Sequence, residues 1–248
     1  MNATGLILAA GKGTRMKTEL PKPLVLLFGK PIVAYIIEAF HKAGIEEVTL
    51  IVGYKADLIK KKLGDQVNYV DQTEQKGTAH AVLQAKDKID WKNKEVFVFV
   101  GDSPLITEKN IHLLYEHHVK TQAHCTFLTA DFQMKLPYAR VVKDADGHLI
   151  KCVEEIDATK EELKITELLS SHFIFKGDSL FKYINEVQPN PKNNEYYLTD
   201  MINILMEKGL KVETLKIDEY EQLLGLNTPE DIIWAQNFIK KELMQAIK

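Results

Sequence analysis

The sequence is poor in cysteine, in long apolar runs and in charge of one sign. Its 248 residues include only two cysteines, Cys125 and Cys152, and neither belongs to a Cys-x-x-Cys pair or a set of zinc ligands. This excludes a disulfide framework and fits a reducing compartment. No apolar run is long enough to span a bilayer, and no basic segment precedes the apolar start at residues 5–10. We therefore expect a cytoplasmic protein without a membrane anchor.

The charge balance excludes another group of functions. The formal net charge is −3, with 27% charged and 45% hydrophobic residues. This charge balance does not indicate nucleic acid or an anionic membrane as a partner. The fraction of hydrophobic residues permits a sizeable core. The sequence contains no internal repeat, no low-complexity stretch and no linker. We expect one domain, residues 1–248, and the sequence leaves the oligomeric state open.

The first half of the chain alternates between apolar runs and amphipathic segments. Continuous apolar runs predict buried strands at residues 4–10, 48–52, 67–70, 96–100 and 123–129. Between them, helices are predicted at 56–62, 77–86, 106–120 and in the segment that follows Pro31. Thr107 is a predicted N-cap. This alternation predicts an α/β fold, a Rossmann-like, mostly parallel sheet with helices on both faces.

The alternation of strands and helices ends after Asp131. Strands at 140–143 and 148–151 flank an Asp-Gly turn and predict a hairpin. Further strands are expected at 172–175 and 211–217, and helices at 177–186, 197–208 and 229–244. We predict a nucleotide-binding part at about 1–130, a β-rich part at about 131–227 that binds a second substrate, and a C-terminal helix at 228–248.

A glycine-bearing loop follows the first strand. Gly11 and Gly13 allow the backbone to approach a ligand, and Arg15 offers a bidentate grip on phosphate oxygens. The loop matches neither a P-loop nor a dinucleotide fingerprint, because Met16 stands where the third glycine is required. Alone, the loop is also typical of an ordinary turn at the end of a strand. It predicts an anion site at the carboxyl edge of the sheet only in combination with the Pro-Lys-Pro segment at 21–23 that follows it.

Lys22 lies between two prolines, Pro21 and Pro23, which stiffen its backbone. A rigid turn with a solvated lysine is one interpretation. The other is an ammonium held in place to neutralise a migrating phosphate, since preorganised charge is the main source of catalytic stabilisation. The glycine loop just upstream favours the second interpretation.

Several motifs together resemble one family, the sugar-phosphate nucleotidyltransferases. They are Leu-Ala-Ala-Gly-Lys-Gly-Thr-Arg-Met from Leu8, then Pro-Lys at 21–22, then Gly-Lys-Pro at 29–31. Within that family the sequence is most similar to the uridylyltransferase domains of bacterial N-acetylglucosamine-1-phosphate uridylyltransferases. The likeness extends from near the N-terminus to about Asp231. No hexapeptide repeat is present, so we do not expect the acetyltransferase activity of those relatives.

The resemblance implies a magnesium-dependent enzyme that transfers a uridylyl group from UTP to a sugar 1-phosphate and releases pyrophosphate, with N-acetylglucosamine 1-phosphate as one candidate acceptor. Its partners would be a nucleoside triphosphate and a sugar 1-phosphate, with no nucleic acid and no membrane. The resemblance also assigns roles. The catalytic residues would be Arg15 and Lys22, and the metal ligands Asp102 and Asn227. The nucleotide would contact Leu8, Ala9, Ala10, Gly11, Gly13, Thr14, Gln72, Gly77 and Thr78, and the sugar would contact Ala139, Glu154 and Leu169.

The departures from the family's motifs fall on the sugar side. Pro137 and Ala139 replace glycines, Leu169 replaces the sugar-contacting asparagine, and Val100 replaces a tyrosine. The acceptor therefore stays open. A thymidylyl- or cytidylyltransferase acting on another phosphorylated acceptor is an alternative, although the carboxamide of Gln72 suits uracil or thymine better than cytosine. A second alternative is a regulatory protein that binds a nucleotide sugar without turning it over.

The remaining histidines receive structural interpretations. His80 lies near the predicted base-binding block, so contact with a ligand is one interpretation, but we expect it to contribute to helix packing. Adjacent His117 and His118 have no matching ligand set in the sequence, so we expect them on a solvated helix face.

Overall fold

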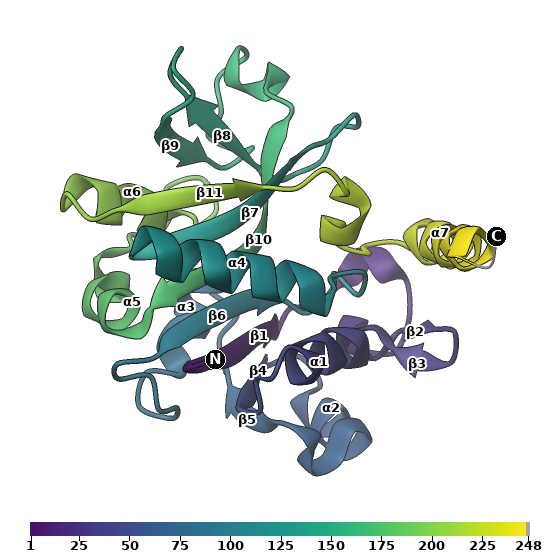
Figure 1. Ribbon diagram of the computed structural model, residues 1–248. Coiled ribbons are helices and arrows are strands. Elements are labelled where there is room, and N and C mark those ends of the chain that lie inside the picture. The colour runs from purple at the N-terminus through teal and green to yellow at the C-terminus, as the bar shows by residue number, and fades with distance from the viewer. Residues whose placement is uncertain (247–248) are drawn as a thin grey trace.

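A nine-stranded sheet organises the computed structural model, which describes residues 1–246 (Figure 1). Its main path runs β11-β7-β10-β6-β1-β4-β5. All neighbours on this path are parallel except β10, which runs antiparallel to both β6 and β7. The predicted mostly parallel sheet is confirmed. The bounds are β1 (Ala3–Ala9), β4 (Val48–Val52), β5 (Asn68–Asp71), β6 (Glu95–Val100), β7 (Cys125–Asp131), β10 (Glu167–Lys176) and β11 (Val212–Lys216).

Helices cover both faces of the sheet, which explains why the central strands are apolar throughout. In β6, Phe97 and Phe99 belong to one hydrophobic cluster, whereas Val96 and Val98 belong to the other. One face is covered by α1 (Ile32–Lys42), α2 (Ala56–Leu63) and α4 (Glu108–Thr121), and Figure 1 shows α4 lying across the strands. The other face is covered by α3 (Thr78–Gln84), α5 (Gly177–Tyr183) and α6 (Asp200–Glu207).

Two hairpins and one helix complete the fold. The predicted hairpin is present as β8 (Ala139–Lys143) and β9 (Leu149–Val153), and β8 pairs with the first half of β10. A second hairpin, β2 (Leu26–Leu27) with β3 (Lys30–Pro31), was not expected. It lies beside α7 (Pro229–Ala246), as Figure 1 shows. The last two residues of the predicted helix 228–248 lie outside the described residues. Among the described helices, none has the length and apolar character needed to cross a bilayer.

The structure corrects three element boundaries. β10 begins at Glu167 rather than at 172, because its pairing continues across a bulge where Ser171 has a φ of 62°. α6 begins at Asp200 rather than at 197, because the backbone of residues 196–198 bonds to Lys76 and to the first two residues of α3 instead. The helix expected at 177–186 ends as a 3-10 turn, Ile184–Glu186. The N-cap at Thr107 is confirmed, in a capping box with Asn110.

Candidate active site

A cavity of about 400 Å³ opens where β1 and β6 end. The loops that follow parallel strands meet at one edge of a sheet, which is where ligands of open α/β folds bind. Every residue that the sequence predicted for catalysis, nucleotide binding or metal binding lines this cavity. These residues are Leu8, Ala9, Ala10, Gly11, Gly13, Thr14, Arg15, Lys22, Gln72, Gly77, Thr78, Asp102 and Asn227.

The glycine loop folds against the side chain of Lys22. Gly13 has a φ of 60°, and a Cβ atom at this position would lie 2.5 Å from Cβ of Lys22. The absence of a side chain at Gly13 therefore allows the loop to pack on the stem of the lysine. On the other side, a 3-10 turn at Lys22–Leu24 follows Pro21 and fixes the backbone. The loop and the turn together direct the ammonium into the cavity.

The ammonium of Lys22 meets two oxygen atoms from distant parts of the chain. Its Nζ donates to the carboxylate of Asp102 and, at 2.7 Å, to Oδ1 of Asn227. The same Asn227 oxygen accepts from the guanidinium of Arg15 at 2.8 Å. The four groups lie on the wall of one cavity and bring two cationic side chains and one carboxylate together. Such a site suits a ligand that carries several phosphates.

Backbone contacts hold the two oxygen-bearing side chains. Asn227 donates from Nδ2 to the carbonyl of Gly225 at 2.8 Å, which turns its Oδ1 toward Lys22 and Arg15. Its backbone N–H donates to the carboxylate of Asp231 in the first turn of α7. The N–H of Leu226 donates to the carbonyl of Asp102 at 2.8 Å. The end of β6 and the start of α7 are thereby joined at the cavity.

Gly225 and Tyr138 support this junction, although neither was predicted as a site residue. A Cβ atom on Gly225 would lie 3.0 Å from Oδ1 of Asp102, so only glycine leaves the carboxylate undisturbed. The N–H of Gly225 donates to the hydroxyl of Tyr138 at 2.8 Å. Burial and the nearby Asp102 raise the pKa of Tyr138, which keeps the phenol neutral. These contacts join residues more than 80 positions apart, so no local pattern predicts them.

His172 is another buried polar side chain close to Asp102. This side chain on β10 is fully buried, and its Nδ1 lies 2.9 Å from the hydroxyl of Ser170. Burial lowers the pKa of His172 to about 4, with a smaller opposing effect from Asp102. The ring is therefore neutral at ordinary pH and adds no charge beneath the site.

Gln72 and Gly77 form the other end of the cavity. Gly77 has a φ of 111°, and a Cβ atom there would lie 2.5 Å from the carbonyl oxygen of Tyr196. Tyr196 bonds on both sides of this glycine: its N–H donates to the carbonyl of Lys76, and its carbonyl accepts from the N–H of Ala79. Thr78 accepts from the N–H of Leu198 through its hydroxyl. The segment before α6 therefore closes this end of the cavity.

Three cavity-lining polar residues were not predicted individually. Gln75 donates from Nε2 to the carbonyl of Gln72 at 2.9 Å. Glu195 and Tyr197 come from the segment before α6. The sequence contained a signal for the last two, because they belong to the Glu-Tyr-Tyr-Leu-Thr-Asp block that resembles the family.

The predicted sugar residues are placed differently from the nucleotide residues. Ala139 and Leu169 pair across β8 and β10, and their exposed fractions are 3% and 1%. Glu154 follows β9 and accepts from the hydroxyl of Thr199 at 2.6 Å. None of the three lines the 400 Å³ cavity. Their contact with a sugar stays a prediction.

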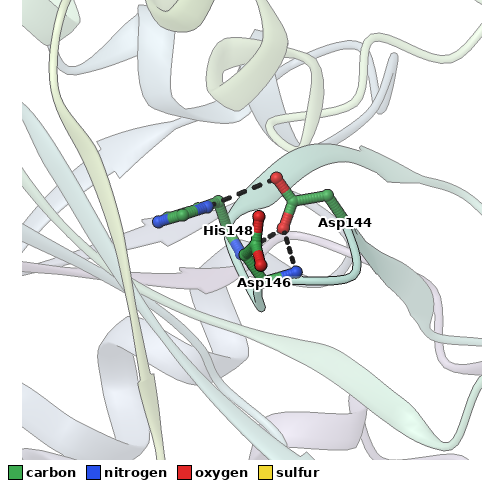
Figure 2. Close-up of side chains that lie close together, drawn as sticks. All are labelled: Asp144, Asp146 and His148. Atoms are coloured by element: carbon green, nitrogen blue, oxygen red, sulfur yellow. Dashed lines mark hydrogen bonds and ion pairs between the residues drawn. The ribbon is translucent and has the colours of Figure 1, made fainter.

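A second acidic group lies on the surface. In the turn between β8 and β9, Asp144, Asp146 and His148 bring their side chains together, as Figure 2 shows. The carboxylate of Asp144 accepts from the backbone N–H groups of Asp146 and His148, which lowers its pKa. All three are exposed, and none lines the cavity. These contacts account for the group as a hairpin turn.

Known proteins similar to this chain include two bacterial proteins of about twice its length. It is 37% identical over 246 residues to the bifunctional protein GlmU of Clostridioides difficile (strain 630), and 38% identical over 245 residues to the bifunctional protein GlmU of Halalkalibacterium halodurans. These alignments cover 99% of this chain but 53% and 54% of the relatives. The chain spans about half the length of the curated relatives it matches.

Solved structures show the same fold at lower identity. A UDP-glucose pyrophosphorylase complexed with UDP-glucose superposes with a TM-score of 0.75 at 21% identity, covering 98% of this chain and 100% of that one. A putative glucose-1-phosphate thymidylyltransferase from Bacillus anthracis, in complex with a sucrose, gives 0.77 at 19% identity, covering 95% and 94%.

A family model matches more than half of the chain. Residues 5–174, which include most of β1, the glycine loop, Lys22 and Asp102, match the model described as MobA-like NTP transferase domain. This region supplies the cavity walls except for Asn227 and the segment before α6. The protein therefore belongs to the family of MobA-like NTP transferase domains.

Proposed function

We propose that this protein transfers a uridylyl group from UTP to a sugar 1-phosphate, giving a UDP-sugar and pyrophosphate, with N-acetylglucosamine 1-phosphate as the first acceptor to test. One observation carries the proposal. Lys22, Arg15, Asp102 and Asn227 converge on the wall of a cavity whose far end is formed by Gln72. The family motifs and the similarity to the GlmU proteins support it.

The residues at this wall fit a divalent cation, and we propose magnesium. A carboxylate oxygen from Asp102 and an amide oxygen from Asn227 both contact one ammonium nitrogen, so the pair already converges on a positive charge. Magnesium prefers oxygen ligands and completes its shell with water and substrate phosphates, so two protein ligands suffice. When bound, the ion would neutralise charge on the phosphates of both substrates.

The remaining chemistry needs only positioning and charge. An oxygen of the sugar phosphate attacks the α-phosphorus of UTP, a new P–O bond forms, and the bond to the β-phosphate breaks as pyrophosphate leaves. The nucleophile is already an anion, so no covalent enzyme intermediate is required. Lys22 and Arg15 offset the negative charge at the phosphates, and the backbone N–H groups of the glycine loop provide further donors.

Pyrophosphate release tests the proposal directly. The purified protein would be incubated with magnesium, one nucleoside triphosphate and one sugar 1-phosphate, with N-acetylglucosamine 1-phosphate and glucose 1-phosphate as acceptors. We expect pyrophosphate and a UDP-sugar to form together when UTP and a suitable acceptor are both present. If no triphosphate and no acceptor yield pyrophosphate while nucleotide binding is retained, the protein is a binding protein rather than a transferase.

A further inference from the structure

His80 lies directly behind Gln72, the side chain at the base end of the cavity. Nδ1 of His80 lies 2.9 Å from Nε2 of Gln72, and the same amide nitrogen lies 3.1 Å from the carbonyl oxygen of Gly77. Gln72 is 3% exposed and yet lines the cavity. Its backbone is also fixed, because its N–H donates to Val52 and its carbonyl accepts from Gln75.

The carbonyl of Gly77 determines which way the amide of Gln72 faces. A backbone carbonyl only accepts, so the amide atom opposite it must be the nitrogen. That nitrogen carries two hydrogens, one for the carbonyl of Gly77 and one for Nδ1 of His80. Nδ1 must therefore present a lone pair, which requires a neutral imidazole with its proton on Nε2.

The surroundings of His80 favour this neutral form. Burial lowers the pKa of His80 most, and the positive charge of Lys76 lowers it further. Glu74 has the opposite but smaller effect, and it forms an ion pair with Lys76. On the other side of the ring, Nε2 of Gln84 donates to the backbone carbonyl of His80 at 3.1 Å and lies 3.3 Å from Nε2 of His80. The contact between Nδ1 and Gln72 is shorter, at 2.9 Å, so we assign the lone pair to Nδ1.

With both amide hydrogens engaged, Gln72 offers the cavity only an acceptor. Within the part of the chain whose side chains are described, residues 1–244, none donates to its Oε1, which leaves this atom for a ligand. Uracil and thymine carry an N–H donor at position 3, whereas cytosine carries an acceptor there. We propose that His80 is a positioning residue that excludes cytosine by holding the amide of Gln72 in this orientation. The inference rests on the proposed function, since it concerns the nucleotide used there.

Three variants test the inference, with UTP and CTP as the probes. His80→Leu removes the acceptor behind Gln72. His80→Asn keeps one, because its Oδ1 is attached where Nδ1 is. Gln84→Leu is the matched control on the same helix, since it contacts the far side of the ring. Equilibrium binding of both nucleotides and kcat/KM for both would be measured, with thermal unfolding to verify that each variant folds.

We expect wild-type protein and Gln84→Leu to prefer UTP to the same degree. In His80→Leu the ratio of UTP to CTP affinity should fall about tenfold, the effect of one neutral hydrogen bond, through KM rather than kcat. His80→Asn should restore most of the ratio. An unchanged ratio in His80→Leu, or equal binding of UTP and CTP by wild-type protein, overturns the inference.

Failure of the proposed function would look different. If wild-type protein binds UTP in preference to CTP but releases no pyrophosphate, the transferase activity is refuted. The ratios of UTP to CTP affinity in the three variants still test the role of His80. If pyrophosphate is released but the ratio does not depend on residue 80, the activity stands and the inference fails.

Discussion

The part of the molecule proposed to bind the nucleotide and the part proposed to bind the acceptor differ in charge and in their match to the family. At the nucleotide end, Lys22 and Arg15 face Asp102 and Asn227 in an open cavity. The proposed acceptor end, around β8, β9 and the start of α6, contains the half-buried carboxylate of Glu154, which accepts from the hydroxyl of Thr199 and lies near the carboxylate of Asp200. The family's motifs are intact at the first end and altered at the second. We infer that the reaction type is set at the nucleotide end, while the acceptor is specific to this chain.

The largest effect is expected from Asp102→Ala. Loss of the carboxylate removes one of two oxygen ligands proposed for magnesium, so kcat/KM should fall between about a hundredfold and a thousandfold. Asp144→Ala, in the exposed acidic turn, is the control and should keep full activity. Titration of magnesium against the rate of pyrophosphate release measures both. A large loss in Asp144→Ala with none in Asp102→Ala would move the metal site to the hairpin.

Lys22→Ala should cost about a hundredfold in kcat/KM, because an ammonium that offsets phosphate charge is lost while the loop can still fold. Lys12→Ala is the matched control, since Lys12 belongs to the same loop but is exposed and does not line the cavity. The same pyrophosphate assay compares the two. Equal activity of both variants would contradict the role given to Lys22.

Gly77→Ala tests, through the stability of the protein, whether the segment at Tyr196 packs closely against Gly77. Its φ of 111° and ψ of 177° suit only glycine, and an added Cβ would lie 2.5 Å from the carbonyl oxygen of Tyr196. We expect a loss of about 2 to 3 kcal/mol in the free energy of unfolding, measured with urea. Gly147→Ala also has a positive φ, 86°, but nothing within 4 Å, so it should lose only about 1 kcal/mol. Equal losses of stability in the two variants would show that contact with Tyr196 adds nothing to the cost of a Cβ atom at residue 77.

Glu154→Gln is expected to have the smallest effect and probes the acceptor end. Burial raises the pKa of Glu154, so the native state keeps its proton to a higher pH than the unfolded chain does. The stability linked to that proton is present at low pH and is lost as the pH rises through the raised pKa. The variant should therefore gain up to about 1 kcal/mol over wild type between pH 5 and pH 8.

Kinetics of the same variant locate the acceptor. If Glu154 accepts from sugar hydroxyl groups, KM for the sugar phosphate should rise several-fold in Glu154→Gln, with KM for UTP unchanged. A change confined to the KM for UTP would place Glu154 at the nucleotide end and erase the distinction between the two ends.

Much of the fold could be predicted from the sequence because the central strands are buried on both faces. Continuous apolar runs at β4 and β6 leave little choice of structure, and Pro31 marks the start of α1. β10 was predicted too short, because the bulge at Ser171 interrupts its pattern. The start of α6 was misplaced because tertiary hydrogen bonds with Lys76 and with the start of α3 replace helical ones.

The site was predictable only in part. The glycine loop and Lys22 are local signals, whereas Asp102 and Asn227 were assigned through the family resemblance, since 125 positions separate 102 from 227. The role of His80 could not be predicted from spacing. It depends on which amide atom faces the carbonyl of Gly77, and that follows only from the distances within the folded segment.

A crystal structure with a non-hydrolysable UTP analogue and manganese, read by anomalous scattering, tests the central claim most directly. We predict a manganese peak in contact with Asp102 and Asn227, the ammonium of Lys22 against the phosphates, and the uracil ring against Gln72. Manganese bound at Asp144 with none at Asp102, or a base lying away from Gln72, would contradict the account.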